Sequence, residues 1–151
     1  MVYDVVTVTL NPALDRVYTL SNLKPGVVHR AEVPNVSAGG KGINVARVLK
    51  SLGVNVLTTG FIAGREGEQL LNRLDREGIP HDFYEVEGNT RTNIKLADNV
   101  SGLTTEINEP GFEVSEKDVE LFCEKLDNLV ENTKYLVLCG SLPKGMSSCF
   151  Y

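Results

Sequence analysis

The sequence predicts an α/β fold in which a parallel sheet carries helices on both faces. Runs of β-branched and apolar residues alternate along the chain with runs of helical periodicity, and this alternation is typical of βα units. The run Leu136-Val137-Leu138-Cys139 lacks a polar and apolar alternation, as expected for a parallel strand that is covered on both faces. Other segments do alternate polar and apolar residues, which favours a second, small antiparallel sheet with one solvated face.

The main sheet and its helices are predicted from seven segments. In chain order these are strand 2–10, helix 42–52, strand 54–61, helix 66–77, strand 79–86, helix 115–130 and strand 135–140. The helices are indicated by apolar spacing, as in Leu70, Leu71 and Leu74. Ser115, with Asp118 three residues later, has the spacing of a capping box in which Asp replaces Glu, and it marks the start of the third helix.

Two insertions interrupt this alternation. Predicted strands at 16–20 and 27–33 separate the first strand from its helix, and a predicted hairpin with strands at 92–97 and 103–107 separates the third strand from its helix. We place the insertions at about 15–36 and 91–108, within one domain that covers residues 1–151. Both leave from strand carboxyl ends, the side on which open α/β sheets bind ligands. We therefore expect the second sheet to form a lid over a binding site.

Composition narrows the function classes. A chain of 151 residues can bury roughly 70% of its unfolded surface, which suits one domain with a sizeable core. The net charge of −5 argues against nucleic acid or an anionic membrane as a partner. No apolar run approaches the ~20 residues that span a bilayer, and no signal-peptide pattern is present. The three cysteines form no Cys-x-x-Cys pair and the two histidines lack ligand spacing, so we expect a cytoplasmic protein without a disulfide framework or metal site.

The glycine-rich segment at residues 37–47, Ser-Ala-Gly-Gly-Lys-Gly-Ile-Asn-Val-Ala-Arg, is the strongest candidate for ligand binding. It lies between a β-like and a helical run, so its backbone N–H groups would stand at a helix N-terminus, where the dipole favours anions. Lys41 adds a positive charge, and Asn44 can hydrogen-bond hydroxyl groups. The segment is not a Walker A loop, because Gly42 follows Lys41 where a hydroxyl is required, and it lacks the dinucleotide-binding spacing. An ordinary glycine-rich turn with a solvated lysine is the alternative.

A carboxylate is expected at the mouth of the main sheet. The first strand runs into Asn11-Pro12 and then reaches Asp15. At the carboxyl end of a strand, Asp15 could accept hydrogen bonds from the hydroxyl groups of a sugar. The alternative is an Asp that satisfies the backbone amides of a local turn.

These motifs resemble those of a known enzyme family. The runs Thr-Leu-Asn-Pro-Ala-Leu-Asp at 9–15 and Ala-Gly-Gly-Lys-Gly-Ile-Asn-Val-Ala-Arg at 38–47 resemble the PfkB (ribokinase-like) carbohydrate kinases, most of all the branch of 1-phosphofructokinase and tagatose-6-phosphate kinase. Further matches follow in the family's order: Gly-Phe-Ile-Ala-Gly at 60–64, Thr-Arg-Thr-Asn-Ile-Lys at 90–95, Glu-Ile-Asn-Glu-Pro-Gly at 106–111 and Cys-Gly-Ser-Leu-Pro-Lys-Gly at 139–145. The resemblance covers the whole chain.

The resemblance implies the N-terminal half of a ribokinase-like fold. Members of this family are about twice as long, and their second half carries the nucleotide pocket and a Gly-Ala-Gly-Asp-like motif whose Asp is the catalytic base. The 151 residues contain no such motif. We therefore expect no catalytic residue and no metal ligand in this chain, expect ATP and Mg²⁺ to be held mainly by the other half, and expect these residues alone to be inactive.

The same resemblance assigns a sugar-phosphate site. It implies that Asp15 binds sugar hydroxyls, that Gly39 and Gly40 let backbone amides approach the ligand, and that Lys41 meets the phosphate, with Asn44 completing this part of the site.

A second part of the site comes from the first strand of the predicted hairpin. Arg91, Asn93 and Lys95 share one face of that strand, and an inward-facing Arg would supply a bidentate phosphate contact. The alternative is a charged, solvated face, which we favour for Lys95 but not for Arg91. Ser141 either contacts the sugar or its phosphate, or caps the following helix.

The implied reaction transfers the γ-phosphoryl group of ATP to a sugar phosphate. Fructose 1-phosphate, giving fructose 1,6-bisphosphate, is the first choice of substrate, and tagatose 6-phosphate is the second. The resemblance also implies a homodimer through the lid. Two hypotheses lie outside this class: a sugar-phosphate-binding module without catalysis, and a structural fragment with an exposed sheet edge.

Overall fold

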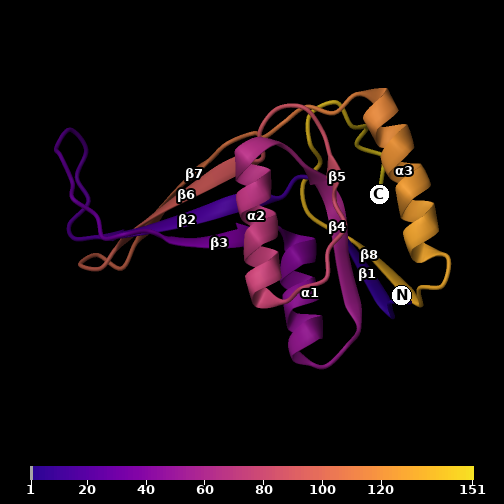
Figure 1. Cartoon of the computed structure of the whole chain (residues 1–151). Helices are drawn as coiled ribbons and strands as arrows, with labels where there is room; N and C mark the ends of the chain where they lie inside the picture. The colour runs from indigo at the N-terminus through magenta and orange to yellow at the C-terminus, as the bar shows by residue number, and fades with distance from the viewer. Residues whose placement is uncertain (1) are drawn as a thin grey trace.

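The structure, a computed structural model, describes residues 2–151 and contains two sheets and three helices within them. In chain order the elements are β1 (Val5–Thr9), β2 (Ala13–Leu20), β3 (Asn35–Gly39), α1 (Lys41–Ser51), β4 (Val56–Ile62), α2 (Gly64–Glu77), β5 (Tyr84–Glu85), β6 (Arg91–Asp98), β7 (Thr104–Asn108), α3 (Glu116–Val130) and β8 (Tyr135–Leu138). One sheet forms the body of the molecule and the other extends away from it (Figure 1).

The central sheet has the strand order β5-β4-β1-β8, and every pair in it is parallel. All residues of β1 and β4 are buried, which explains why their sequences carry so few charges. Helices α1 and α2 pack on one face through Ile43, Ala46, Leu70 and Leu74, and α3 covers the other face (Figure 1). The predicted parallel sheet with helices on both faces is confirmed.

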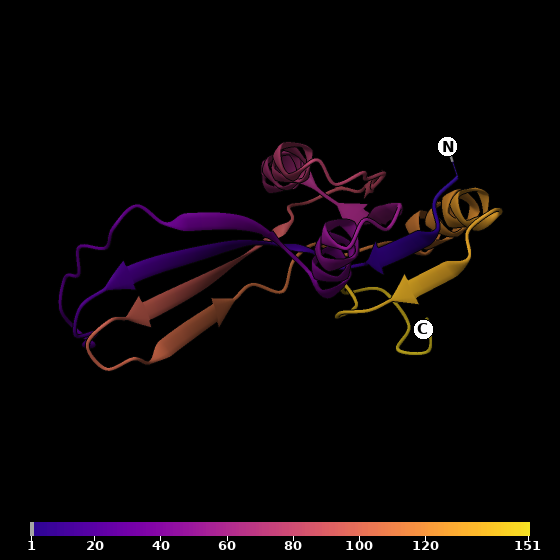
Figure 2. The same ribbon diagram turned by 90° about the horizontal axis from the view of Figure 1, so that it is seen from below.

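The second sheet has the order β3-β2-β6-β7 and forms an extended arm (Figure 2). Its outer pairs are antiparallel, but β2 and β6 at its centre are parallel, with Asp15 opposite Asn93. The expectation of a purely antiparallel sheet was therefore wrong for this pair. The reason is geometric: β2 and β6 each leave the carboxyl edge of the central sheet, so they run outward in the same direction.

The strand expected at 27–33 does not form. That segment is irregular, and the antiparallel partner of β2 is β3, which includes residues that the sequence analysis placed in the glycine-rich loop. Pro25 and Pro34 flank the irregular segment, and proline cannot donate to a sheet ladder. The side chains of Val28 and Val33 are 86% and 95% exposed, so their apolar character builds no core here.

The other elements agree with expectation within a few residues, apart from the strand at 79–86. Only Tyr84–Glu85 form a strand there, although the backbone at His81 also bridges to Thr58 of β4. The capping box of α3 is present, since the Ser115 hydroxyl accepts from the Asp118 N–H and the Asp118 side chain accepts from the Ser115 N–H. Across residues 2–151, no helix combines the length and apolar character needed to cross a membrane.

Candidate functional site

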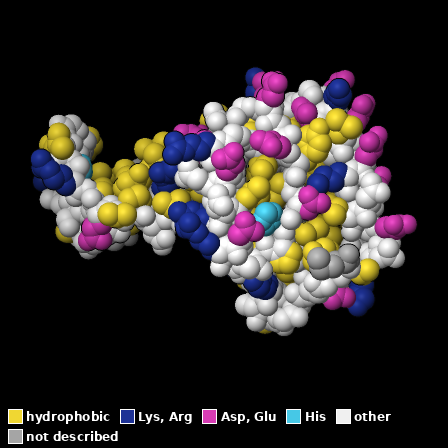
Figure 3. Space-filling view, in the orientation of Figure 1, with side chains coloured by type: hydrophobic (Ala, Val, Ile, Leu, Met, Phe, Trp, Pro, Cys, Tyr) yellow, Lys and Arg dark blue, Asp and Glu magenta, His cyan; other side chains and the backbone are white. Residues whose placement is uncertain are grey.

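The candidate site lies at the carboxyl edge of the central sheet, where the second sheet joins it. The loops that follow β1 and β8 meet the first residue of β6 there. Arg91 Nη2 donates to the backbone oxygen of Asn11 at 3.0 Å and contacts Ser141 Oγ at 3.2 Å. Lys and Arg side chains gather on the face shown in Figure 3 where the arm leaves the body.

Asp15 and Asn93 form the polar centre of this junction. Asn93 Nδ2 donates to Asp15 Oδ1 at 2.9 Å, across the paired strands β2 and β6. On the other side of Asp15 lies Gly39 of β3, where an added Cβ would lie 2.5 Å from Asp15 Oδ2. A side chain at this position would therefore displace the carboxylate of Asp15 from its present place. Asn93 Oδ1 is buried and has no hydrogen-bond partner within residues 2–151, so this pair retains an unused acceptor.

Arg91 is held in a partly desolvated position. Burial lowers the pKa of its guanidinium below the ordinary value, and the negative charge of Asp15 opposes that shift. An arginine remains charged at neutral pH, so the site presents a positive guanidinium near a carboxylate. Its Nε is buried and has no partner among the described residues, which leaves a donor for an incoming acceptor.

The N-terminus of α1 is capped from a neighbouring strand. Gly40 occupies the cap position with φ 138°, and it offers no side chain, so the Ile43 N–H donates instead to Oγ1 of Thr9 at 3.0 Å. An added Cβ at Gly42 would lie 2.5 Å from the same hydroxyl oxygen. The glycines therefore bring the helix end close to β1. Lys41 at this helix end is exposed, and none of the ion pairs found in residues 2–151 involves it.

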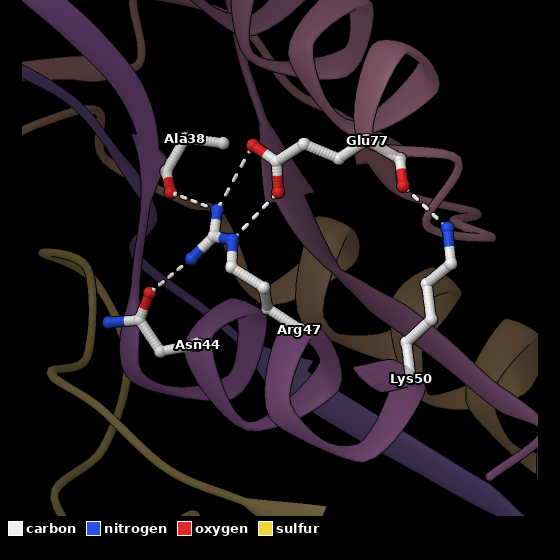
Figure 4. A network of polar contacts seen from close by, with 5 residues as sticks. All are labelled: Ala38, Asn44, Arg47, Lys50 and Glu77. Carbon is white, nitrogen blue, oxygen red and sulfur yellow. Dashed lines mark hydrogen bonds and ion pairs between the residues drawn. The ribbon is translucent and has the colours of Figure 1, made fainter. Parts of the chain in front are cut away.

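Asn44 belongs to a separate network on the flank of α1 (Figure 4). Arg47 Nη1 donates to Asn44 Oδ1 at 2.6 Å, Arg47 Nη2 donates to the backbone oxygen of Ala38 at 3.0 Å, and Arg47 Nε pairs with Glu77 Oε2 at 2.7 Å. Lys50 reaches the backbone oxygen of Glu77. This network ties α1 to β3 and to the end of α2, and it occupies the oxygen of Asn44 while its amide nitrogen points away from the network.

Lys95 lies farther out along the arm. It forms an ion pair with Glu106 of β7, with 3.5 Å between Nζ and Oε1. The structure thus brings Asp15, Gly39, Arg91, Asn93 and Ser141 together. Lys41 lies beside Gly140, next to Ser141, whereas Asn44 and Lys95 each have partners outside this group.

The sequence analysis missed two residues that shape the junction. Thr9 caps α1, and Asn11 holds loops from distant parts of the chain. A polar residue at the carboxyl end of a buried strand is a signal that could have identified both, because such a position faces the ligand side of an open α/β sheet.

Comparison with known proteins gives the chain a family. The model of the pfkB family carbohydrate kinases matches residues 3–150. A 1-phosphofructokinase from Vibrio cholerae is 43% identical over 148 residues, which are 97% of this chain and 46% of that protein. The chain thus spans about half the length of the curated relative.

Two solved structures share the fold. The crystal structure of a possible 1-phosphofructokinase from Thermotoga maritima matches with a TM-score of 0.88 at 37% identity, over 95% of this chain and 46% of that one. Phosphofructokinase-2 from Escherichia coli, in complex with fructose-6-phosphate, matches with a TM-score of 0.89 at 30% identity, over 96% of this chain and 48% of that one. With a family model covering nearly every residue and the predicted motifs in place, the chain belongs to the pfkB family of carbohydrate kinases.

Proposed function

We propose that this chain forms the sugar-phosphate-binding part of an ATP-dependent kinase that converts fructose 1-phosphate to fructose 1,6-bisphosphate. The observation that carries the proposal is the junction itself, where Asp15 and Asn93 lie beside the guanidinium of Arg91. A carboxylate and an amide suit the hydroxyl groups of a sugar, and a guanidinium suits a phosphate. The identity to the Vibrio cholerae 1-phosphofructokinase supports this choice of substrate.

Each residue has a binding role in this proposal. Asp15 accepts hydrogen bonds from the sugar hydroxyls, and the free oxygen of Asn93 accepts another. Arg91 binds the phosphate through charged hydrogen bonds, and Lys41 reaches it from the N-terminus of α1, whose dipole favours an anion. Gly39 and Gly40 let β3 and the helix end approach, while Asn44, Lys95 and Ser141 contribute at the rim.

In this proposal we assign none of the residues of this chain as a ligand of the Mg²⁺ that accompanies ATP. Residues 2–151 contain no group of three or more His, Cys, Asp or Glu side chains that could hold a metal ion. Every step that we assign to the chain is therefore one of binding and orienting the sugar phosphate.

Calorimetric titration of the purified chain tests the proposal. We expect fructose 1-phosphate to bind, tagatose 6-phosphate to bind more weakly, and ATP to give no measurable heat. Preference for tagatose 6-phosphate would move the proposal to tagatose-6-phosphate kinase. Absence of binding by either sugar phosphate would contradict the proposed function of the chain.

Two substitutions test the phosphate contacts. Arg91→Ala and Lys41→Ala should each weaken fructose 1-phosphate binding about ten- to hundredfold, since a charged hydrogen bond contributes about 1.5–3 kcal/mol. Lys134→Ala is the matched control, because Lys134 pairs with Asp4 at the opposite edge of the central sheet. A similar loss in all three variants would show that the effect is not specific to the site.

The second sheet also suits self-association, and we propose that two copies pair through it. On β6 the residues alternate, so that Arg91, Asn93 and Lys95 share one face while Ile94 and Leu96 share the other. The apolar face lines a groove of about 620 Å³ together with residues of β2 and the loop before β3. We expect light scattering to give twice the monomer mass, and Ile94→Glu to give a monomer. Val48→Glu, at an exposed apolar position on α1, is the control that should leave the mass unchanged.

A further inference from the structure

Asn11 joins three segments of the chain at the candidate site. Asn11 follows β1 and is only 4% exposed. Its Nδ2 donates to the backbone oxygens of Pro110 at 3.1 Å and Leu142 at 3.4 Å. Both acceptors are carbonyls, so the orientation of the amide is fixed with its nitrogen toward them. One side chain thus holds the connection between β7 and α3 against the loop that follows β8.

The segments that Asn11 joins are also the ones that contact Arg91. The backbone oxygen of Asn11 accepts from Arg91 Nη2, and the same nitrogen contacts Ser141, the neighbour of Leu142. An added Cβ at Gly111 would lie 3.5 Å from both Cβ and Cδ of Arg91. Arg91 is therefore enclosed by the residue Asn11 itself and by the two loops that its side chain holds.

The side-chain oxygen of Asn11 makes no hydrogen bond in the part of the chain that the structure describes. Asn11 Oδ1 is buried, and an added Cβ at Gly111, where φ is 90°, would lie 2.7 Å from it. A buried acceptor without a donor is unfavourable for folding, so the oxygen itself does not account for an amide at this position. The amide is better explained by what its nitrogen holds in place.

We infer that Asn11 is a positioning residue for Arg91: it fixes the two loops around the guanidinium so that the guanidinium is ready to bind the phosphate. The inference rests on the proposed function, because it assigns to Arg91 the capture of a sugar phosphate. Asn11 acts on the ligand only through Arg91, and this indirect action distinguishes it from a contact residue. The inference predicts that the effects of substituting Asn11 and Arg91 on sugar-phosphate affinity are coupled.

A double-mutant cycle measures this coupling. Fructose 1-phosphate is titrated into the wild-type chain, Asn11→Ala, Arg91→Ala and the double variant. We expect each single substitution to weaken binding at least about tenfold, and the double variant to bind within about threefold of Arg91→Ala alone. Losses that multiply would show that Asn11 acts independently of Arg91 and would overturn the inference while the proposed function stands.

Two variants separate positioning from a general loss of structure. Asn55→Ala is the matched control, because Asn55 Nδ2 likewise donates to a backbone oxygen, that of Val2, but at the opposite edge of the sheet. We expect it to bind within about twofold of wild type. Asn11→Asp keeps the shape of the side chain and removes its donor, and it should lose affinity as Asn11→Ala does. A folded Asn11→Asp chain with full affinity would also overturn the inference.

If the wild-type chain binds no sugar phosphate, the proposed function is refuted. A measurement without ligand then still tests whether Asn11 positions Arg91. The buried Nε–H of Arg91 can be followed by ¹⁵N-resolved NMR in wild type and in Asn11→Ala. We expect its exchange with water to become at least about tenfold faster in the variant. The Nε–H of Arg47, held by Glu77, is the internal control and should not change. An unchanged rate for Arg91 would show that Asn11 does not position it.

Discussion

The two sheets of this protein are stabilised in different ways. In the central sheet, β1 and β4 are buried at every position and lie between helices on both faces. In the second sheet, β7 is exposed at every position, and β6 is only partly buried until its last residue, Asp98. Figure 2 shows the outer part of the second sheet extending beyond the helices, whereas Leu14 and Ala38 at the base of β2 and β3 belong to the core with α1 and α2.

This difference assigns separate tasks to the two regions. Apolar burial makes the central sheet a rigid support, whereas main-chain pairing and a few polar contacts hold the outer part of the second sheet. The candidate site lies where they meet, so its residues on β2 and β6 are positioned by both. Substitutions should therefore have large effects on stability in the central sheet and small ones in the outer part of the second sheet.

The largest effect is expected at Phe61 of β4. Its ring is fully buried and lies 4.6 Å from that of Phe122 on α3 and 6.4 Å from that of Phe112, measured between centroids. Phe61→Ala should lower the free energy of unfolding by about 3–5 kcal/mol, because it leaves a cavity in the core. Ile107→Ala on β7 should change it by less than about 0.5 kcal/mol. Urea denaturation of both variants measures the contrast, and similar losses would contradict it.

A smaller effect, which depends on pH, is expected at Asp98. Its carboxylate accepts from the N–H groups of Val100, Asn22 and Leu23 and from the hydroxyl of Ser101. The Val100 N–H contributes most to lowering the pKa of Asp98 well below its ordinary value of 3.8, and burial opposes the shift. These contacts fasten the loop after β2 to the turn between β6 and β7.

The sign of the pH dependence follows from that lowered pKa. A carboxylate whose pKa is lower in the folded state stabilises the fold above its unfolded value, near 3.9, and the contribution is lost as the pH falls below it. Asp98→Asn should therefore lower the melting temperature at pH 7, and the difference from wild type should shrink as the pH is lowered toward 3. A difference that stays constant with pH would show that the charge of Asp98 is not responsible.

Buried threonines sharpen the comparison within the central sheet. The hydroxyl of Thr9 caps α1, whereas the buried hydroxyl of Thr58 has no partner among the described residues. Thr9→Val should lower the free energy of unfolding by about 0.5–2 kcal/mol, as the loss of a helix cap does. Thr58→Val should raise it by up to about 1 kcal/mol, because an unsatisfied polar group is removed from the core. Chemical denaturation measures both free energies of unfolding. Equal destabilisation by the two substitutions would show that the Thr58 hydroxyl does have a partner.

Local patterns in the sequence predicted the central sheet better than the second one. Helix α3 and its capping box could be predicted because they depend on residues a few positions apart, such as Ser115 and Asp118. The strand expected at 27–33 was wrong because alternation alone does not reveal the pairing partner, and the return strand starts after Pro34. The parallel pairing of β2 with β6 joins residues about eighty positions apart, as Asp15 and Asn93 are, and no local pattern encodes it.

The residues of the candidate site likewise differ in how far the sequence could predict them. Gly39, Lys41 and Arg91 could be proposed because glycine and positive charge at strand ends are typical of anion sites. Asn11 could have been marked only by its position after a buried strand. Its role could not be predicted, because its partner Leu142 lies 131 positions away and its burial becomes evident only in the fold. The pairing of Lys95 with Glu106 likewise depends on the register of β6 and β7, which the sequence does not show. For Lys95 the sequence analysis favoured only the prediction of a solvated face.

The smallest effect is expected at Lys95, and it tests whether the second sheet itself reaches the ligand. The ion pair with Glu106 is partly exposed, so Lys95→Ala should change the free energy of unfolding by less than about 0.5 kcal/mol. It should also weaken fructose 1-phosphate binding less than about threefold, against ten- to hundredfold for Arg91→Ala, because Arg91 lies at the junction and Lys95 does not. Titration of both variants compares the two positions on one strand. A tenfold loss in Lys95→Ala would mean that the outer part of the arm moves onto the sugar phosphate when the sugar phosphate binds. The contrast between a rigid central sheet and a peripheral second sheet would then not hold for the bound state.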